Sequence, residues 1–296
     1  MRAKEKAYAK LNLALKAGAK NDGFHELDGI AVTVDLFDVV TVESRRDDKI
    51  VLNPAGLREY VYNCTPTEDN AYKAAKVFAE KYSVGGVNIT VKKNIPLSGG
   101  MGGSSTDAAA VLKAMAKLYK IEDDLEPLAN LLGSDTAYLL NGGFARLQGR
   151  GEVIKPLSVS QTLHFAVLYP EKGVNTAACF AEFDKNPSSE LAVSDIDNLE
   201  NYLCTLGGYY DFDEFSRNLQ NCKNDLYSAA KSIEPAVGTA FEAVSSLSPS
   251  VTFMTGSGST VCGIFPTEQL ARWAVDKLKQ SGFDAEYLRS VCLKRR

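Results

Sequence analysis

Apolar residues alternate with other residues near the start of the chain, which predicts a pair of β-strands. The alternation runs loosely from Lys6 to Lys16, and a second run of β-forming residues covers Ile30 to Val42. The sequence Asn21-Asp22-Gly23 lies between them, and residues of these types favour the turns that join strands. We therefore expect the two runs to form one long hairpin.

A glycine-rich stretch is flanked by a predicted strand and a predicted helix. Residues 69–82 form a capped helical pattern, and residues 87–91 alternate as a strand. After the glycines, apolar residues return at helical spacing over residues 108–118. The strand thus enters the glycine-rich stretch, and an amphipathic helix that begins near Ser104 or Ser105 leaves it.

The second half of the chain alternates strands and helices. Strands are predicted at residues 163–169, 251–254 and 261–265, and helices at about 176–183, 191–206, 235–246 and 268–281. Such alternation is typical of an α+β or α/β domain. We place the boundary near Ser158, which divides the chain into domains of residues 1–158 and 159–296.

Charge and composition exclude several classes of protein. The formal net charge is −4, and neither nucleic acid nor an anionic membrane attracts an acidic protein. The first ten residues contain no apolar run, so we expect no secretory signal, no membrane span and a cytoplasmic location. Six cysteines without a Cys-x-x-Cys pair, and only two histidines, argue against a structural zinc site or a disulfide framework. A soluble enzyme with reduced thiols is expected.

The stretch from Pro96 to Asp107 has the features of a phosphate-binding loop. Its glycines let the backbone approach a ligand and adopt positive φ, and the following helix directs unpaired N–H groups into the same space. A helix N-terminus of this kind attracts anions. The candidate phosphate-binding residues are Pro96, Ser98, Gly99, Gly100, Met101, Gly102, Gly103, Ser104, Ser105 and Thr106.

This loop differs from two common nucleotide-binding motifs. The Gly-Lys-Ser/Thr ending of a Walker A loop is missing, and the glycine spacing differs from the dinucleotide fingerprint. The alternative is a simple turn in which one serine caps the helix. Four glycines and three hydroxyls between a strand and a helix favour the phosphate site, with Asp107 as a partner of the helix dipole or a cap rather than a catalyst.

Phosphoryl transfer to an alcohol needs a cation and, often, a carboxylate that takes the hydroxyl proton. Asp135 follows Gly133 and precedes an apolar run at residues 137–140. Lys10 has an even number in a strand whose apolar residues are odd-numbered. From these residues alone, the simpler interpretations are a helix-capping aspartate and a solvent-exposed lysine.

Five sequence blocks together resemble the GHMP kinase superfamily. They are Ala9-Lys10-Leu11-Asn12-Leu13, Asp22-Gly23-Phe24-His25-Glu26-Leu27, the loop from Pro96 to Ala109, Leu132-Gly133-Ser134-Asp135, and Thr255-Gly256-Ser257-Gly258-Ser259-Thr260. They span nearly the whole chain in the order of the family. The resemblance implies a two-domain α+β fold, with a ferredoxin-like C-terminal domain and an active site between the domains.

The resemblance also implies roles for individual residues. Asp135 would take the proton from the substrate hydroxyl, Lys10 would hold that hydroxyl and the carboxylate in place, and the loop would bind the phosphates of ATP. Mg²⁺ is expected because it bridges ATP phosphates in such reactions, although the sequence indicates no ligands for it. The substrate-side residues implied by the resemblance are Asn12, Phe24, His25, Lys93, Phe180, Gly256 and Ser257.

The Asp-Gly-aromatic-His block implies a substrate alcohol that carries a cytidine diphosphate group. His25 would hydrogen-bond the cytosine edge, and Phe24 and Phe180 would stack on the two faces of the ring. The family usually has tyrosine in place of Phe24, so a hydroxyl is missing here. The loop also has Ser98 and Ser104 where glycines are common.

Several alternatives remain open at this stage. The two phenylalanines can be ordinary packing residues, since aromatic side chains more often pack than bind. Another member of the superfamily would act on a different alcohol, such as mevalonate, homoserine or a sugar. A nucleotide-binding protein without catalytic activity would keep the loop, and the sequence allows either a monomer or a homodimer.

Overall fold

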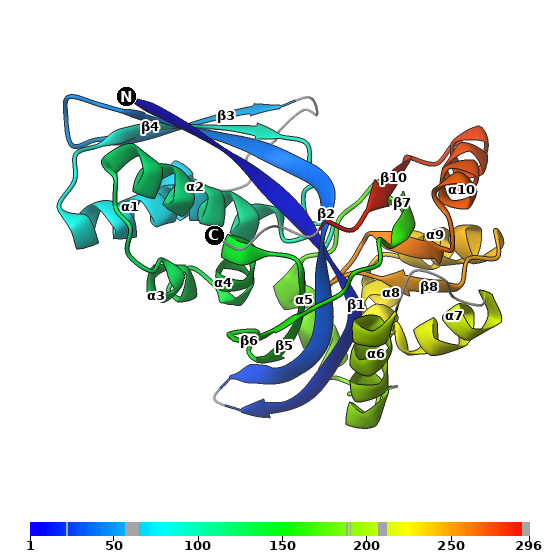
Figure 1. The fold of residues 1–296 in the computed structure, drawn as a ribbon. Coiled ribbons are helices and arrows are strands. Elements are labelled where there is room, and N and C mark those ends of the chain that lie inside the picture. The colour runs from blue at the N-terminus through cyan, green and yellow to red at the C-terminus, as the bar shows by residue number, and fades with distance from the viewer. Residues whose placement is uncertain (22, 57–64, 188, 190, 207–211, 292–296) are drawn as a thin grey trace.

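A long β-hairpin runs through the molecule (Figure 1). The computed structural model describes residues 1–21, 23–56, 65–187, 189, 191–206 and 212–291. Strands β1 (Arg2–Asn21) and β2 (Phe24–Ser44) pair antiparallel over almost their full length. This confirms the predicted hairpin. Both observed strands are longer than the sequence pattern predicted.

The hairpin belongs to a six-stranded sheet. Its order is β3-β4-β2-β5-β6, with β1 paired to β2. The other strands are β3 (Ile50–Gly56), β4 (Val87–Lys93), β5 (Phe144–Gly149) and β6 (Val153–Leu157). Among the strands that the structure describes in this sheet, β3 and β4 are the only parallel pair. Strand β3 was not predicted from the sequence pattern.

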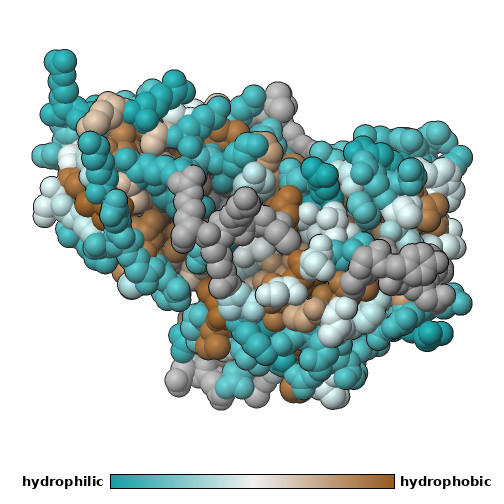
Figure 2. All heavy atoms as spheres, in the orientation of Figure 1, coloured by the Kyte–Doolittle hydropathy of each residue, from teal (hydrophilic) through white to brown (hydrophobic). Residues whose placement is uncertain are grey.

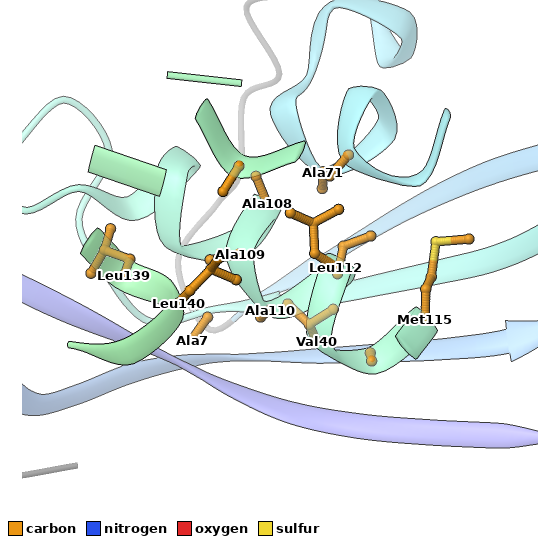
Figure 3. Packing of buried hydrophobic residues seen from close by; sticks show 14 of the residues in the cluster. Ala7, Val40, Ala71, Ala108, Ala109, Ala110, Leu112, Met115, Leu139 and Leu140 are labelled. Carbon is orange, nitrogen blue, oxygen red and sulfur yellow. The ribbon is translucent and has the colours of Figure 1, made fainter. Parts of the chain in front are cut away.

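Over the described part of this half, four α-helices accompany the sheet, and the central one follows the glycine-rich loop (Figure 1). They are α1 (Asn70–Tyr82), α2 (Gly103–Tyr119), α3 (Glu126–Asn130) and α4 (Ser134–Asn141); a short 3-10 turn, η1 (Pro66–Glu68), precedes α1. Figure 3 shows side chains of α2, among them Ala109, Leu112 and Met115, packed between helices and strands. Burial on several sides fixes this helix firmly, so its first turn is held in a defined place.

The second half of the chain forms a ferredoxin-like sheet. Its strands are β7 (His164–Leu168), β8 (Val251–Met254), β9 (Val261–Phe265) and β10 (Ala285–Arg289), in the antiparallel order β10-β7-β9-β8. In chain order this is 4-1-3-2, the arrangement of a split β-α-β unit. The predicted ferredoxin-like topology is therefore present.

Six helices accompany the second sheet within the described residues. They are α5 (Thr176–Phe183), α6 (Val193–Thr205), α7 (Phe212–Asn218), α8 (Tyr227–Ile233), α9 (Ala236–Ser245) and α10 (Glu268–Gln280), with a 3-10 turn η2 (Leu219–Asn221). The crossover helices α9 and α10 pack on one face of the sheet. Helices α7 and α8 were not predicted.

The opposite face of the second sheet packs on the hairpin. Successive side chains of a strand point to opposite faces: Ala166 and Leu168 face α9 and α10, whereas Phe165 and Val167 join a core with Leu11 of β1. The hairpin therefore contributes to the packing of both halves of the molecule. Its predicted site residues lie where the two halves meet.

The face seen in Figure 2 is mostly hydrophilic, with small apolar areas between polar ones. Over the part of the chain that the structure describes, no helix combines the length and apolar character needed to cross a membrane.

Candidate active site

Lys10 and Asp135 lie next to each other, although 124 residues separate them in the sequence. The Nζ atom of Lys10 is 3.3 Å from Oδ2 of Asp135. Lys10 is only 5% exposed, whereas 34% of the Asp135 side chain remains exposed. The interpretation of Lys10 as a solvent-exposed lysine is therefore wrong: the glycine-rich loop covers this face of β1, and the backbone N–H of Lys10 donates to the carbonyl of Met101.

Asn12 orients the ammonium group of Lys10 from the same strand. Its Oδ1 accepts a hydrogen bond from Lys10 Nζ. Its own backbone N–H donates to Oγ1 of Thr255, at 2.9 Å, from the second half of the molecule. The side chains of Lys10 and Asn12 are both buried. The Asn12 side chain therefore holds the ammonium group of Lys10 in place, and Thr255 in turn holds the backbone of Asn12.

Asp135 is the second residue of α4 and does not cap that helix. The N-cap is Gly133, whose φ of 138° lies in a region that favours glycine. With no capping bond to make, the carboxylate of Asp135 is directed to Lys10. The helix-cap interpretation of this aspartate is wrong.

The glycine-rich loop ends at the first turn of α2, where no side chain caps the helix. Gly102 is the N-cap, with a φ of 72°. The first amide groups of α2 thus meet none of the side-chain acceptors that usually satisfy a helix start. Ser104 is exposed and accepts a hydrogen bond from Asn70 Nδ2 at 2.8 Å. Such a start is suited to an anion.

Two further residues of the predicted phosphate loop use their side chains within the fold. The Met101 side chain is 1% exposed. Thr106 is buried and its hydroxyl donates to the carbonyl of Tyr8 at 2.8 Å. A contact of either residue with phosphate would therefore come from its backbone, and such contacts stay predictions for every residue of the loop.

The two glycine-rich segments of the chain touch through their backbones. A Cβ atom on Gly100 would lie 2.2 Å from the carbonyl oxygen of Thr255, and one on Gly256 would lie 2.5 Å from that of Gly100. Both glycines have positive φ. Neither position therefore tolerates a side chain without displacement of the other segment. Ser257, also buried, places its Oγ 2.9 Å from Oγ1 of Thr176.

A pocket of about 250 Å³ brings these parts together. Its lining includes Lys10, Asn12, Ser105, Asp135, Phe180 and Gly256. The first turn of α2, the Lys10–Asp135 pair and the second glycine-rich segment thus border one space. A larger hollow of about 1200 Å³, between β1, α2 and α4, contains none of the predicted site residues.

Lys93 does not line this pocket. Its Nζ lies 2.6 Å from Oδ2 of Asp107 and also contacts Asp38. All three residues are buried. Burial raises the pKa of Asp107 to about 8, which the Lys93 ammonium opposes and the Asp38 carboxylate reinforces. Asp107 is therefore a buried ion-pair partner and not only a residue of the helix dipole, and ligand contact by Lys93 stays a prediction.

The residues expected to bind cytosine lie beside one another, but they contact other groups. The ring of His25 stacks on Phe180, with 5.1 Å between the ring centres. Its Nδ1 is 3.0 Å from the carbonyl oxygen of Gly18, and its Nε2 is 2.8 Å from Oδ1 of Asp184. Phe24 is 56% exposed. The sandwich of cytosine between the two phenylalanines stays a prediction.

Asp184 is a residue of this region that the sequence did not indicate. A hydrogen bond from Lys20, at 2.8 Å, and the neighbouring His25 hold the pKa of its carboxyl below the usual range. The carboxylate thus occupies one nitrogen of the histidine that was expected to contact the base. Its position just after the end of α5 carries no motif, so only the fold reveals it.

Comparison with known proteins places the chain in a family. A profile described as GHMP kinases N terminal domain matches residues 69–144, and one described as GHMP kinases C terminal matches residues 209–284. The chain is 35% identical over 283 residues to 4-diphosphocytidyl-2-C-methyl-D-erythritol kinase of Clostridium perfringens, with 93% of each chain covered. This protein is a member of the GHMP kinase family.

A second relative and a solved structure support this assignment. The relative named 4-diphosphocytidyl-2-C-methyl-D-erythritol kinase in Clostridium beijerinckii is 33% identical, with 97% of this chain and 100% of the relative covered. A crystal structure of 4-(cytidine 5'-diphospho)-2C-methyl-D-erythritol kinase superposes with a TM-score of 0.72 at 27% identity, covering 97% of this chain and 99% of the other.

The GHMP kinase fold is also found with other substrates. A homoserine kinase from Cytophaga hutchinsonii superposes with a TM-score of 0.75 at 17% identity, covering 99% of this chain and 96% of the other. At this identity the likeness shows the fold alone. The predicted fold and the predicted class, an ATP-dependent small-molecule kinase, are confirmed by family membership.

Proposed function

We propose that this kinase transfers the terminal phosphoryl group of ATP to the 2-hydroxyl of 4-diphosphocytidyl-2-C-methyl-D-erythritol, a step of non-mevalonate isoprenoid biosynthesis. The observation that carries the proposal is the pocket shared by Ser105, Lys10 and Asp135. It provides an anion site and a cation–carboxylate pair, which are the two parts that phosphoryl transfer to an alcohol requires. The names of the relatives support the choice of alcohol.

In this mechanism Asp135 accepts the proton of the attacking hydroxyl. Its partial exposure leaves the carboxylate accessible from the pocket. The ammonium of Lys10, fixed by Asn12, lies 3.3 Å away and keeps the hydroxyl and the carboxylate in line. The first turn of α2 holds the phosphates by its free amide groups and the Ser105 hydroxyl. Positioning and charge stabilisation then supply most of the catalysis.

Mg²⁺ would accompany the nucleotide. Among the residues that the structure describes, no group of three or more His, Cys, Asp or Glu side chains is arranged to hold a metal ion. Hydroxyl groups at the start of α2, water and the ATP phosphates are therefore the proposed ligands. When bound, the ion neutralises charge on the transferred phosphoryl group.

The cytidine end of the substrate would lie near Phe24, His25 and Phe180. A cytosine that hydrogen-bonds to Nε2 of His25 must displace the carboxylate of Asp184 from that nitrogen or share it. We also propose that the two domains divide near Ser158, between β6 and β7, and that the enzyme acts in the cytoplasm as a monomer or homodimer.

A coupled assay of ADP release tests the proposed function. The purified protein with Mg-ATP is offered the cytidine diphosphate alcohol, mevalonate, homoserine and galactose in parallel. ADP should form only with the first. Turnover of a different alcohol would replace this proposal by another GHMP kinase activity, and ATP binding in calorimetry without turnover of any alcohol would indicate a non-catalytic nucleotide-binding protein.

A further inference from the structure

The active-site pocket contains a second cation besides Lys10. Arg150, in the turn between β5 and β6, lines the same space as Lys10 and Asp135. The sequence did not indicate it, because one arginine in a turn matches no motif. Lys10 already contacts Asn12 and Asp135. The second cation, Arg150, is therefore available to bind another group.

The turn that carries Arg150 rests directly on the start of α4. A Cβ atom on Gly151 would lie 2.9 Å from Cβ of Ser134, the residue before Asp135. Gly151 has a φ of 103°, in the region that favours glycine. The backbone N–H of Arg150 donates to Oε2 of Glu152 at 2.6 Å. These contacts hold the turn against the start of α4, and Arg150 and Asp135 line the same pocket.

The guanidinium group of Arg150 makes no ion pair with a carboxylate in the described part of the chain. It lies over the ring of Phe24, 4.3 Å from the ring centre. Arg146, on β5 just before this turn, provides a contrast: its guanidinium is 2.7 Å from Asp28 and 2.6 Å from Asp197. The charge of Arg146 is used to fasten β5 to β2 and α6, whereas the charge of Arg150 is available in the pocket.

We propose that Arg150 binds the diphosphate group of the substrate, an inference that rests on the proposed function. A nucleoside diphosphate alcohol has its base at one end, its reacting hydroxyl at the other and the diphosphate between them. Arg150 touches Phe24 of the base end and lines the pocket with Lys10 and Asp135 of the hydroxyl end. A guanidinium presents paired N–H donors that match phosphate oxygens, and a neighbouring ring leaves those in-plane donors accessible.

This role would make Arg150 a residue that selects nucleotidyl alcohols over free alcohols. Mevalonate and homoserine have no diphosphate to pair with it. The competing explanation is a cation–π contact that only supports the Phe24 ring. The two explanations differ in which part of the ligand depends on Arg150, the phosphates or the base.

Calorimetric titration of two probes separates them. Cytidine carries the base alone, and CDP-glycerol carries the base and a diphosphate ester of a small alcohol. We expect Arg150→Ala to weaken CDP-glycerol binding by about 10-fold to 100-fold and cytidine binding by less than about twofold, since hydrogen bonds to charged groups contribute that much. Arg150→Lys should recover part of the loss because it keeps the charge without the fork.

Arg272→Ala is the matched control. Its guanidinium also lies over an aromatic ring, 4.1 Å from the centre of Tyr287, but on α10 and outside the pocket. This variant should bind both probes like the intact protein. Thermal unfolding of each variant checks the fold, since Arg150 makes only a backbone hydrogen bond and a ring contact.

Kinetics with the cytidine diphosphate alcohol completes the test. Arg150→Ala should raise KM with little change in kcat, because a diphosphate remote from the reacting atoms is bound equally in the ground and transition states. An equal loss for both probes, or no loss for either, would overturn the diphosphate role while turnover by the intact enzyme upholds the proposed function. If the intact protein neither binds CDP-glycerol nor releases ADP, the proposed function itself fails and this inference fails with it.

Discussion

Lys10 and Lys93 are two lysines with the same exposure and opposite surroundings. Each is 5% exposed. Lys93 is enclosed by Asp38 and Asp107, whose side chains are 0% and 8% exposed. Lys10 faces one carboxylate, that of Asp135, which is 34% exposed and borders the pocket.

The difference separates a lysine enclosed by acidic side chains from one whose partner borders a pocket. Lys93, at the end of β4, lies between Asp38 of β2 and Asp107 of α2, and its ammonium contacts both acidic side chains within the protein. This cluster fastens α2 to the sheet and so fixes the first turn, which we propose binds the phosphates. Lys10 keeps a partner that can also reach a ligand. Burial alone therefore does not distinguish the two lysines, and we base the proposed catalytic role of Lys10 on the accessibility of its partner.

The largest effect is expected from replacing either residue of the Lys10–Asp135 pair. Lys10→Ala or Asp135→Asn should lower kcat by about 100-fold to 10,000-fold, because proton transfer loses its acceptor or its alignment. Steady-state ADP release measures this loss, and the unfolding temperature should change little. Lys4→Ala, an exposed lysine on the same strand, should leave kcat unchanged. Normal turnover in both site variants would contradict the proposed mechanism.

A large loss of stability is expected from removing Lys93 from its buried cluster with Asp38 and Asp107. Lys93→Met leaves two buried carboxylates without a cation, which should cost about 3 to 5 kcal/mol in the free energy of unfolding. Urea denaturation measures this change. The control is Lys155→Met, whose ammonium is 2.6 Å from Glu200 with a side chain that is 62% exposed; its loss should stay below about 1 kcal/mol. Equal losses of unfolding free energy in the two variants would show that the enclosure of Lys93 adds nothing to stability beyond what an exposed ion pair contributes.

An effect that is smaller for each pH unit should appear in the dependence of stability on pH. The pKa of Asp107 is raised from 3.8 to about 8 in the folded protein, so between these values the folded state holds a proton that the unfolded state has released. Its contribution to stability is complete below about pH 4 and is lost as the pH rises toward 8. The loss is at most about 1.4 kcal/mol for each pH unit.

Asp107→Asn removes this proton and leaves a simple pair of Lys93 with Asp38. Urea denaturation at several pH values between about 5 and 8 should therefore show a flatter profile for the variant than for the parent protein. If the two profiles have the same slope, Asp107 is not the group that takes the proton in this cluster.

Much of the architecture could be predicted because it follows from local patterns. The loose alternation of β1 predicted one strand of the hairpin. The runs of β-forming or apolar residues in β2, β8 and β9 predicted three more. The stripe of Ala71, Ala74, Ala75 and Phe78 in α1 is buried as expected. Strand β3 contains Pro54, a residue that disfavours strand interiors, and its pairing with β4 could not be inferred from its own residues.

The candidate site could be predicted only in part. Family blocks pointed to Lys10, Asp135 and the glycine-rich loop, which the fold brings to one pocket. Asp184 and Arg150 carried no signal, because their neighbours in space, His25 and Phe24, lie far from them in the sequence. A motif records spacing along the chain, and these contacts have no fixed spacing.

The sequence by itself determined the strands, the helices, the flexible backbone of the loop and the family. Only the tertiary structure decided which charges are free to act. Asp38 lies 55 residues before Lys93 and closes the cluster around it, while Asp135 leaves Lys10 facing a pocket. The physical reason is that periodicity depends on neighbours along the chain, whereas the work that a charge can do depends on burial and on partners that folding alone brings near.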